Sequence, residues 1–458
     1  MCICDNGGPT RHLVPVARLD HSPKTLDIVD LSHDGRGVAR WPDGMANAGK
    51  TVFVAGALPG ESVSVQQTAR SRSFDEARTI DVLTASPDRV QPRCPHFGVC
   101  GGCVLQHLAE DKQIEVKQRV LLDNLQRIGH VTPERVLPPL SGDAWGYRRK
   151  GRFSVRRVEK KDKTLVGFRE QDPRFVADIR ECHVVVPQLG FKVEALSALV
   201  DGLDARRDIP QIEFIAGDAG AALVFRHLQP LSEADLGKLQ AFAREHGFAI
   251  FLQPGGLDSV HPLAGEAAQL AFRLPQWDID LQFRPLDFIQ VNAKLNEAMI
   301  ALALGLLDVQ PGERVLDLFC GLGNFTLPLA RVAGEVVGVE GDAGLVKRAR
   351  ANAVHNGLDN VQFHAADLAQ DLAGQPWLKA GFDKVLLDPA RSGALEVLKQ
   401  LPLKGLQRIV YVSCHPGSLA RDAGYLVNER GWKLRAAGAM DMFPHTAHVE
   451  SIAVFEPG

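Results

Sequence analysis

Residues 314–323, which read RVLDLFCGLG, place an apolar strand directly before a glycine turn. Such a run, with an acidic residue at its end and a Gly-x-Gly turn after it, is typical of nucleotide-binding α/β sheets. The turn extends from Asp317 to Thr326, and Thr326 stands where a dinucleotide fingerprint has its third glycine. NAD is therefore disfavoured. Glu340, about twenty residues further on at the end of the next strand, instead suits the ribose of S-adenosylmethionine.

The same pattern continues to the C-terminus. Strand-like runs recur as EVVGVEGD, NVQFHAADL, FDKVLLDPA, QRIVYVSC and SIAVFEP, with helical stretches between them. This alternation predicts an α/β, Rossmann-like catalytic domain over residues 286–458, built on a doubly wound parallel sheet. Ligands of such sheets bind at the carboxyl ends of the strands. The candidate cofactor contacts lie there or just before the sheet: Gln290, Phe319, Asn324, Glu340, Asp367 and Asp388.

An all-β pattern precedes the central part of the chain. Residues 23–82 alternate apolar and polar positions between glycine-rich turns, which predicts a small β-barrel after a tail of residues 1–22. The segments DGRGVAR and VFVAGALPGESV, followed by RSRSFDEA, resemble the TRAM domain, an OB-like RNA-binding module. A generic β-domain would show the same alternation.

Cysteines are grouped at the start of the next segment. Cys94, Cys100 and Cys103 lie in CPHFGVCGGC, and Cys182 lies far downstream in IRECHVV. The glycines of this loop let the backbone fold closely, and four thiolates suit a metal centre. Zinc sites usually show paired CxxC motifs, whereas three clustered cysteines and a distant one suit a [4Fe–4S] cluster at least as well.

The central domain, residues 83–285, combines this loop with a predicted helix over 108–128 and further helices near 187–202 and 231–246. A basic stretch with interleaved aromatics, YRRKGRFSVRRVEKK at residues 147–161, is a candidate RNA contact, although the formal net charge of the chain is −3. A solvated pair of strands would look similar.

The expected compartment of the protein follows from two sequence features that it lacks. It shows no signal-peptide core and no run of the roughly 20 apolar residues that a bilayer crossing requires. We therefore expect a cytoplasmic protein without a membrane segment. In that reducing compartment its eight cysteines are ligands, catalysts or core residues rather than disulfides.

Three motifs near the C-terminus carry the chemistry. They are DPARSG at 388–393, YVSCHP at 411–416 and MDMFPHTAHVE at 440–450. Together they resemble the uracil-C5 methyltransferase family, whose pattern is DP(P/A)RxG, YxSC and DxFPxTxHxE. The resemblance covers essentially the whole chain. His415 and Ser418 depart from it, since the family usually has asparagine and threonine there.

The resemblance implies S-adenosylmethionine-dependent methylation of uracil carbon 5. Cys414 would add to carbon 6 as the nucleophile, Glu450 would remove the carbon-5 proton, and Asp388 would orient the uracil. It also implies that the four cysteines hold a [4Fe–4S] cluster, and that the substrate is a flipped-out uridine in 23S rRNA. Aromatic side chains often fill the gap that a flipped base leaves, and Phe288, just before Gln290, is the candidate here. No obligate protein partner is implied.

Several alternatives stay open at this stage. A tRNA or other-rRNA uracil methyltransferase differs only in substrate, and a cytosine-C5 enzyme is a further step away. A non-catalytic iron–sulfur RNA-binding protein is disfavoured by intact Cys414, Glu450 and Asp388, and a dehydrogenase by Thr326. Radical enzymes that combine a cluster with S-adenosylmethionine require CxxxCxxC, which the cysteine loop lacks.

Overall fold

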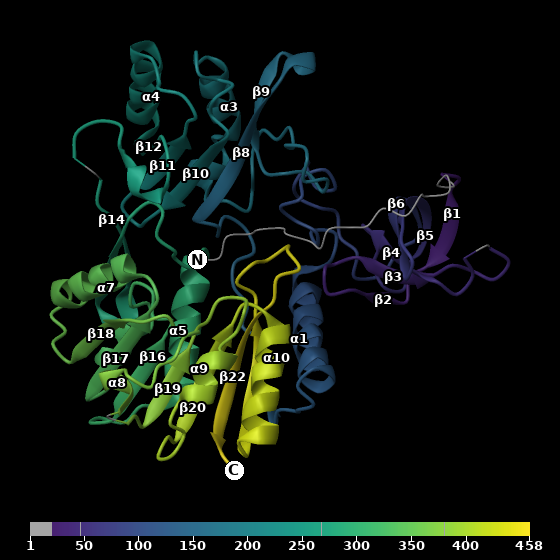
Figure 1. Ribbon diagram of the computed structural model, residues 1–458. Coiled ribbons are helices and arrows are strands. Elements are labelled where there is room, and N and C mark those ends of the chain that lie inside the picture. Colours follow the sequence, from purple (N-terminus) through teal and green to yellow (C-terminus); the bar gives the residue numbers. More distant parts are fainter. Residues whose placement is uncertain (1–20, 46, 267, 380) are drawn as a thin grey trace.

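The computed structural model of the protein describes residues 21–458, except residues 46, 267 and 380. The predicted tail, residues 1–22, lies almost wholly outside the described residues. Figure 1 shows a small curled β-sheet, a central sheet packed against helices, and a larger α/β sheet. Within the described part of the chain, no helix has both the length and the apolar character needed to cross a bilayer.

The strands predicted for residues 23–82 are confirmed. They form a six-stranded sheet in the order β1-β5-β6-β4-β3-β2. Alternate residues point into a core that includes Trp41, Val52 and Val65, and β1 also contacts β3, so the sheet curls on itself. Its strands are Lys24–Asp27 (β1), Asp30–Leu31 (β2), Gly37–Arg40 (β3), Thr51–Ala55 (β4), Ser62–Arg70 (β5) and Phe74–Thr84 (β6).

A connecting segment joins this sheet to the rest of the molecule. It holds the cysteine loop, residues 94–103, then the predicted helix as α1 (Glu110–Arg127), and β7 (Arg135–Val136). Figure 1 shows α1 beside α10 (Pro416–Gly424), and β7 pairs with β21 of the large sheet. This part of the predicted central domain therefore packs on the catalytic sheet.

The central sheet has the order β13-β12-β11-β10-β8-β9. The helices predicted near 187–202 and 231–246 are confirmed, and their apolar faces pack on the core of this sheet. The elements are Lys150–Val158 (β8), Lys163–Gly167 (β9), Pro187–Gly190 (α2), Val193–Asp201 (α3), Gln211–Ala216 (β10), Ala221–Arg226 (β11), Glu233–His246 (α4), Phe248–Gln253 (β12) and His261–Pro262 (β13). A hairpin, Leu270–Leu274 (β14) with Ile279–Phe283 (β15), leads to the large sheet.

The large sheet has the order β18-β17-β16-β19-β20-β22-β21-β7. Its elements are Ala293–Leu307 (α5), Arg314–Leu318 (β16), Thr326–Ala330 (α6), Glu335–Glu340 (β17), Ala343–His355 (α7), Val361–Ala365 (β18), Pro376–Lys379 (α8), Lys384–Leu387 (β19), Leu395–Gln400 (α9), Arg408–Ser413 (β20), Trp432–Met440 (β21) and Glu450–Pro457 (β22), together with α10. Strands β16 to β20 are parallel, as predicted.

The last strand corrects the prediction of a purely parallel sheet. β22 runs antiparallel to both β20 and β21, because the chain reverses in the hairpin loop between Met440 and Glu450. An antiparallel strand begins where its parallel neighbours end. The N-terminal end of β22 therefore lies at the same edge of the sheet as the carboxyl ends of β16 to β20.

Helices cover both faces of this sheet, as the doubly wound prediction requires. Val315 of β16 lies in the core that contains the apolar residues of α5, and the neighbouring Leu316 lies in the core beneath α1 and α10. Since successive strand residues point to opposite faces, apolar runs are needed in strands that are buried on both sides.

Candidate active site

A tight turn after β16 forms one side of the site. Phe319 has φ 66°, which is rare for an aromatic residue, and its amide donates to the Val339 carbonyl at 2.9 Å. The Gly321 amide donates to Glu340 Oε2 at 3.2 Å, and the Asp342 amide donates to Glu340 Oε1 at 3.1 Å. The turn and the strand-end acid Glu340 are thus fixed to each other.

Asp317 lies beneath this turn and is fully buried. Its Oδ2 accepts a 2.5 Å hydrogen bond from the Thr326 hydroxyl, whereas its Oδ1 has no hydrogen-bond partner. Burial, reinforced by the Glu340 carboxylate, raises the pKa of Asp317 to about 7. Thr326, which stands where a dinucleotide fingerprint has its third glycine, therefore donates a hydrogen bond to Asp317, the acidic residue at the start of the turn.

The remaining cofactor candidates approach from two sides. Asn324 exchanges two side-chain hydrogen bonds of 2.9 Å with Asn296 of α5, which ties the turn to the start of that helix. Gln290, just before α5, is buried, and its carbonyl accepts from Arg149 Nε at 2.9 Å. Asp367, beyond β18, is exposed, and its Oδ1 accepts from the Ala369 amide at 3.0 Å.

The three reactive candidates converge at the ends of adjacent strands. Ser413 of β20 pairs with Ser451 of β22. Because the two strands are antiparallel, Cys414, which follows Ser413, lies beside Glu450, which precedes Ser451. Asp388 follows β19, the other neighbour of β20. Glu450 is buried with 5% of its surface exposed, whereas Cys414 is partly open to a cleft. The geometry places a thiol and a carboxyl beside each other where a ligand can enter.

The two departures from the family pattern form one capping interaction. His415 is the N-cap of α10, and its Nδ1 accepts a 3.1 Å hydrogen bond from the Ser418 amide. The Ser418 hydroxyl in turn donates to the His415 carbonyl at 3.0 Å. An asparagine side chain can accept the same amide proton, so histidine replaces it as a cap.

The loop between β21 and β22 is held from outside the catalytic sheet. The His445 carbonyl accepts from the Val104 amide at 2.9 Å and the Leu105 amide at 3.0 Å, directly after the cysteine loop. The His445 ring lies 4.0 Å from the Trp145 ring, centroid to centroid. Burial, reinforced by the Lys117 ammonium, lowers the pKa of His445 to about 4, so the ring is neutral at pH 7. The neutral ring, packed against Trp145, helps to hold this loop in place.

The structure brings the four predicted cluster cysteines together. Cys94, Cys100, Cys103 and Cys182 are free cysteines that line one cleft. Burial raises the pKa of Cys100 to about 11 and that of Cys103 to about 12. No group of three histidine, cysteine, aspartate or glutamate side chains among the described residues is placed to hold a single metal ion.

Gly101 of this loop packs against a second segment of the backbone. The Gly101 amide donates to the Arg169 carbonyl at 2.8 Å, and a Cβ on Gly101 would lie only 2.8 Å from the Glu170 carbonyl oxygen. The close approach that requires glycine is therefore to the backbone of residues 169–170.

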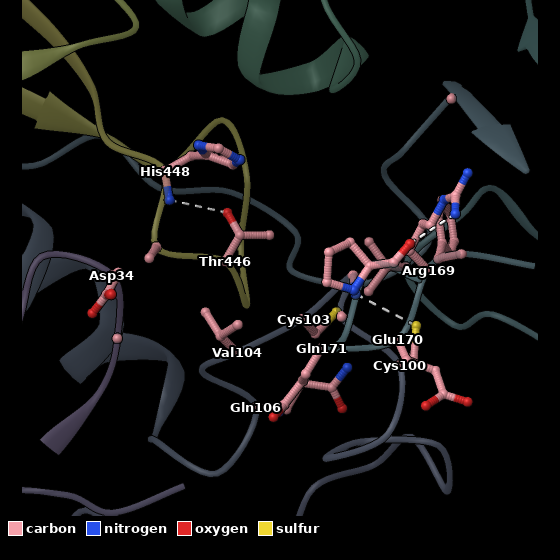
Figure 2. Close-up of a pocket in the computed structure, with 18 of the residues that line it drawn as sticks. Asp34, Cys100, Cys103, Val104, Gln106, Arg169, Glu170, Gln171, Thr446 and His448 are labelled. Carbon is pink, nitrogen blue, oxygen red and sulfur yellow. Dashed lines mark hydrogen bonds between the residues drawn. The ribbon is translucent and has the colours of Figure 1, made fainter. Parts of the chain in front are cut away.

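One large cleft of about 3020 Å³ extends from the curled sheet past the cysteine loop to Cys414. Figure 2 shows Asp34 of the curled sheet, Cys100 and Cys103 of the cysteine loop, and Thr446 and His448 of the loop before β22, all of which line it. Cys414 and Phe288 also line this cleft. It is long enough to connect the reactive thiol with the N-terminal sheet.

The basic stretch is only partly available to a ligand, which corrects the prediction for it. Arg149 is 4% exposed, and its guanidinium lies over the Phe272 ring at 4.3 Å. The Lys150 ammonium donates to the Asp287 carbonyl. Both side chains thus brace the segment that carries Phe288 and Gln290, a role that charge alone does not distinguish from phosphate binding.

These features define a class of protein: an α/β enzyme with a glycine turn tied to an acidic strand end on one half of its sheet and a cysteine beside a glutamate on the other. A family model described as tRNA (Uracil-5-)-methyltransferase matches residues 266–456.

Full-length relatives make the assignment more specific. The chain is 71% identical to the 23S rRNA (uracil(1939)-C(5))-methyltransferase RlmD of Xanthomonas euvesicatoria, over 96% of this chain and 98% of the relative. It is 70% identical to the protein of the same name from Stenotrophomonas maltophilia K279a, again over 96% and 98%. The chain therefore belongs to the RlmD family of uracil-C5 methyltransferases, which are S-adenosylmethionine-dependent enzymes.

A solved structure supports the fold. The tRNA (uracil-54, C5)-methyltransferase of Pyrococcus abyssi, in complex with S-adenosyl-L-homocysteine, aligns with a TM-score of 0.70 and 24% identity, over 94% of this chain and 99% of that chain.

Proposed function

We propose that this protein methylates carbon 5 of a uridine in 23S rRNA, in the cytoplasm, through a covalent bond between Cys414 and carbon 6. The observation that carries the proposal is the register of β20 and β22, because it sets Cys414, which lines the cleft, beside Glu450. Relatives that are about 71% identical carry the name of this rRNA activity.

The reaction needs both residues because carbon 5 of uracil is a weak nucleophile. The Cys414 thiolate adds to carbon 6, and the ring electrons move to an enolate that carbon 5 can use to attack a methyl group. Glu450 then accepts the carbon-5 proton. The electrons of that C–H bond restore the double bond, and the sulfur leaves carbon 6 as a thiolate. Asp388, beside them, orients the uracil edge.

Residues at the other half of the sheet suit S-adenosylmethionine, which would supply the electrophilic methyl group and, as its S–CH3 bond breaks, would leave as S-adenosylhomocysteine. Glu340 would hold the ribose hydroxyls, Asp367 the adenine edge, and Phe319, Asn324 and Gln290 the methionine part. The unpartnered Asp317 Oδ1 beneath the turn supports this fit, because a buried acceptor without a donor favours a ligand with hydrogen-bond donors.

The four cysteines suit a [4Fe–4S] cluster. All four line one cleft, and iron–sulfur clusters are bound by cysteine thiolates. A cube of four irons keeps its ligands farther apart than a single ion does, which agrees with a set unsuited to one ion. The cluster would hold the loop of residues 94–103 in shape. Iron and sulfide analysis of anaerobically purified protein tests this.

RNA would enter along the cleft. Phe288 lines it with 44% of its surface exposed, next to the segment that carries Gln290, and suits the gap left by a flipped base. The curled sheet of residues 23–82 would act as an OB-like TRAM module, and its Arg36 and Arg78 line the same cleft. Phosphate contacts of this kind make affinity fall as salt rises.

Transfer of a labelled methyl group tests the substrate. The protein is given S-adenosylmethionine with either 23S rRNA fragments or tRNA, and the methylated nucleoside is identified. We expect 5-methyluridine in 23S rRNA alone. Product in tRNA would change the substrate, and no product in any RNA from protein that binds the cofactor would favour a non-catalytic RNA-binding role.

A further inference from the structure

Helix α1 carries a buried lysine that the mechanism above does not use. The Lys117 side chain is 2% exposed, and its ammonium donates to Asp441 Oδ1 at 2.6 Å and to the Phe443 carbonyl at 2.9 Å. The side chain of Asp441 is 7% exposed. A lysine is rarely buried so completely, since removing its charge from water is costly. Its position therefore calls for a role in the loop that it contacts.

Two more polar side chains of the same helix form hydrogen bonds with this loop and with the end of β21 that leads into it. The Gln113 amide nitrogen donates to the Leu105 carbonyl at 3.1 Å, and its oxygen accepts from the His445 amide at 2.8 Å. Gln118 Oε1 accepts from the Ala439 amide at 2.6 Å. Helix α1 thus fixes the end of β21, the first residues after it, and the middle of the loop.

The loop held in this way ends at Glu450. Asp441 is the first residue after β21, and Glu450 is the first residue of β22, where it pairs with Met440. Lys117 therefore contacts the loop beside the position of Glu450. Burial lowers the pKa of Lys117, while attraction to the carboxylates of Asp441 and Glu450 opposes that shift. The ammonium is close enough to Glu450 to attract it.

We propose that Lys117, supported by Gln113, is a positioning residue for Glu450, which orients its carboxylate toward carbon 5 of the methylated uracil. The proposal rests on the proposed function and assigns Lys117 to one step of it, the removal of the carbon-5 proton. The hydrogen bonds of the Lys117 ammonium go to Asp441 and Phe443, so we expect its substitution to leave addition of Cys414 and transfer of the methyl group unaffected.

Single-turnover kinetics separate these steps. The wild-type protein and Lys117→Met are given an RNA fragment with tritium at carbon 5 of the uridines, together with methyl-labelled S-adenosylmethionine. Methyl transfer to RNA and tritium release are followed together. We expect Lys117→Met to transfer the methyl group at the wild-type rate but to release tritium about 10- to 100-fold more slowly, with methylated covalent adduct accumulating.

Two further variants complete the test. Lys112→Met alters a lysine on the surface of the same helix, paired with Glu115, and should match the wild type in both signals. Lys117→Met with Asp441→Asn removes both buried charges, so it avoids leaving Asp441 without a counter-charge, and should again slow tritium release alone. Equal slowing of both signals, or of neither, in the folded variants would overturn the proposal. Absence of both signals in the wild-type protein would instead refute the proposed function.

Discussion

The cofactor half and the reactive half of the catalytic sheet are supported in different ways. Around β16 and β17 the support is local, because Glu340 accepts amides of its own turns and Asp317 accepts the Thr326 hydroxyl. Around β22 the support comes from the distant helix α1 and from the chain after the cysteine loop. We infer that the two halves can be perturbed separately.

The largest effect is expected from Glu450→Gln, which alters the reactive half alone. The amide cannot accept the carbon-5 proton, so turnover should fall by about 10²- to 10⁴-fold while the methylated adduct accumulates. Steady-state methylation and gel analysis of the adduct measure both effects. Affinity for S-adenosylmethionine, measured by calorimetry, should not change, and a loss of affinity would break the separation of the two halves.

Asp317→Asn tests the cofactor half through the pH dependence of stability. The folded-state pKa of Asp317 is raised to about 7 from an ordinary 3.8, so the folded protein binds this proton more tightly than the unfolded chain does. The contribution of Asp317 is fully present below about pH 4 and is lost as pH rises toward 7, by roughly 1.4 kcal/mol per pH unit.

Urea unfolding of both proteins at several pH values measures this contribution. The free energy of unfolding of Asp317→Asn relative to the wild type should rise between pH 4 and pH 7. A constant difference across that range would mean that Asp317 is not buried in the protonated form.

A smaller effect is expected at the helix cap beside the nucleophile. His415→Ala removes the acceptor for the Ser418 amide and should lower the free energy of unfolding by about 0.5–2 kcal/mol, whereas His415→Asn should stay close to the wild type. Burial lowers the pKa of His415, so the cap is intact above the ordinary histidine pKa and is lost as pH falls through the lowered value. Denaturation of the three proteins at pH 7.5 and pH 5 checks this, and equal stability of His415→Ala and wild type at pH 7.5 would contradict it.

The contrast between local support of the cofactor half and distant support of the reactive half also explains which parts of the site the sequence predicts. The glycine turn and Glu340 are close in sequence, so the strand-turn pattern was enough to bring them together. The supports of the reactive half were missed, because periodicity identified α1 as an amphipathic helix but not the loop that Lys117 contacts. The charge of Arg149 likewise suggested RNA contact, although burial and an aromatic ring hold it inside. A lysine on the helix face that carries Ile114, Leu121 and Leu125 is the available signal for Lys117.

Covalent trapping is the most direct test of the central claim, that Cys414 is the nucleophile of a uracil-C5 methyltransferase. The protein is mixed with S-adenosylmethionine and a 23S rRNA fragment carrying 5-fluorouridine, which has no carbon-5 proton to remove. We expect a stable protein–RNA adduct that shifts on a denaturing gel and disappears in Cys414→Ala. An adduct that persists in Cys414→Ala, or no adduct from a wild-type protein that binds the cofactor, would contradict the account.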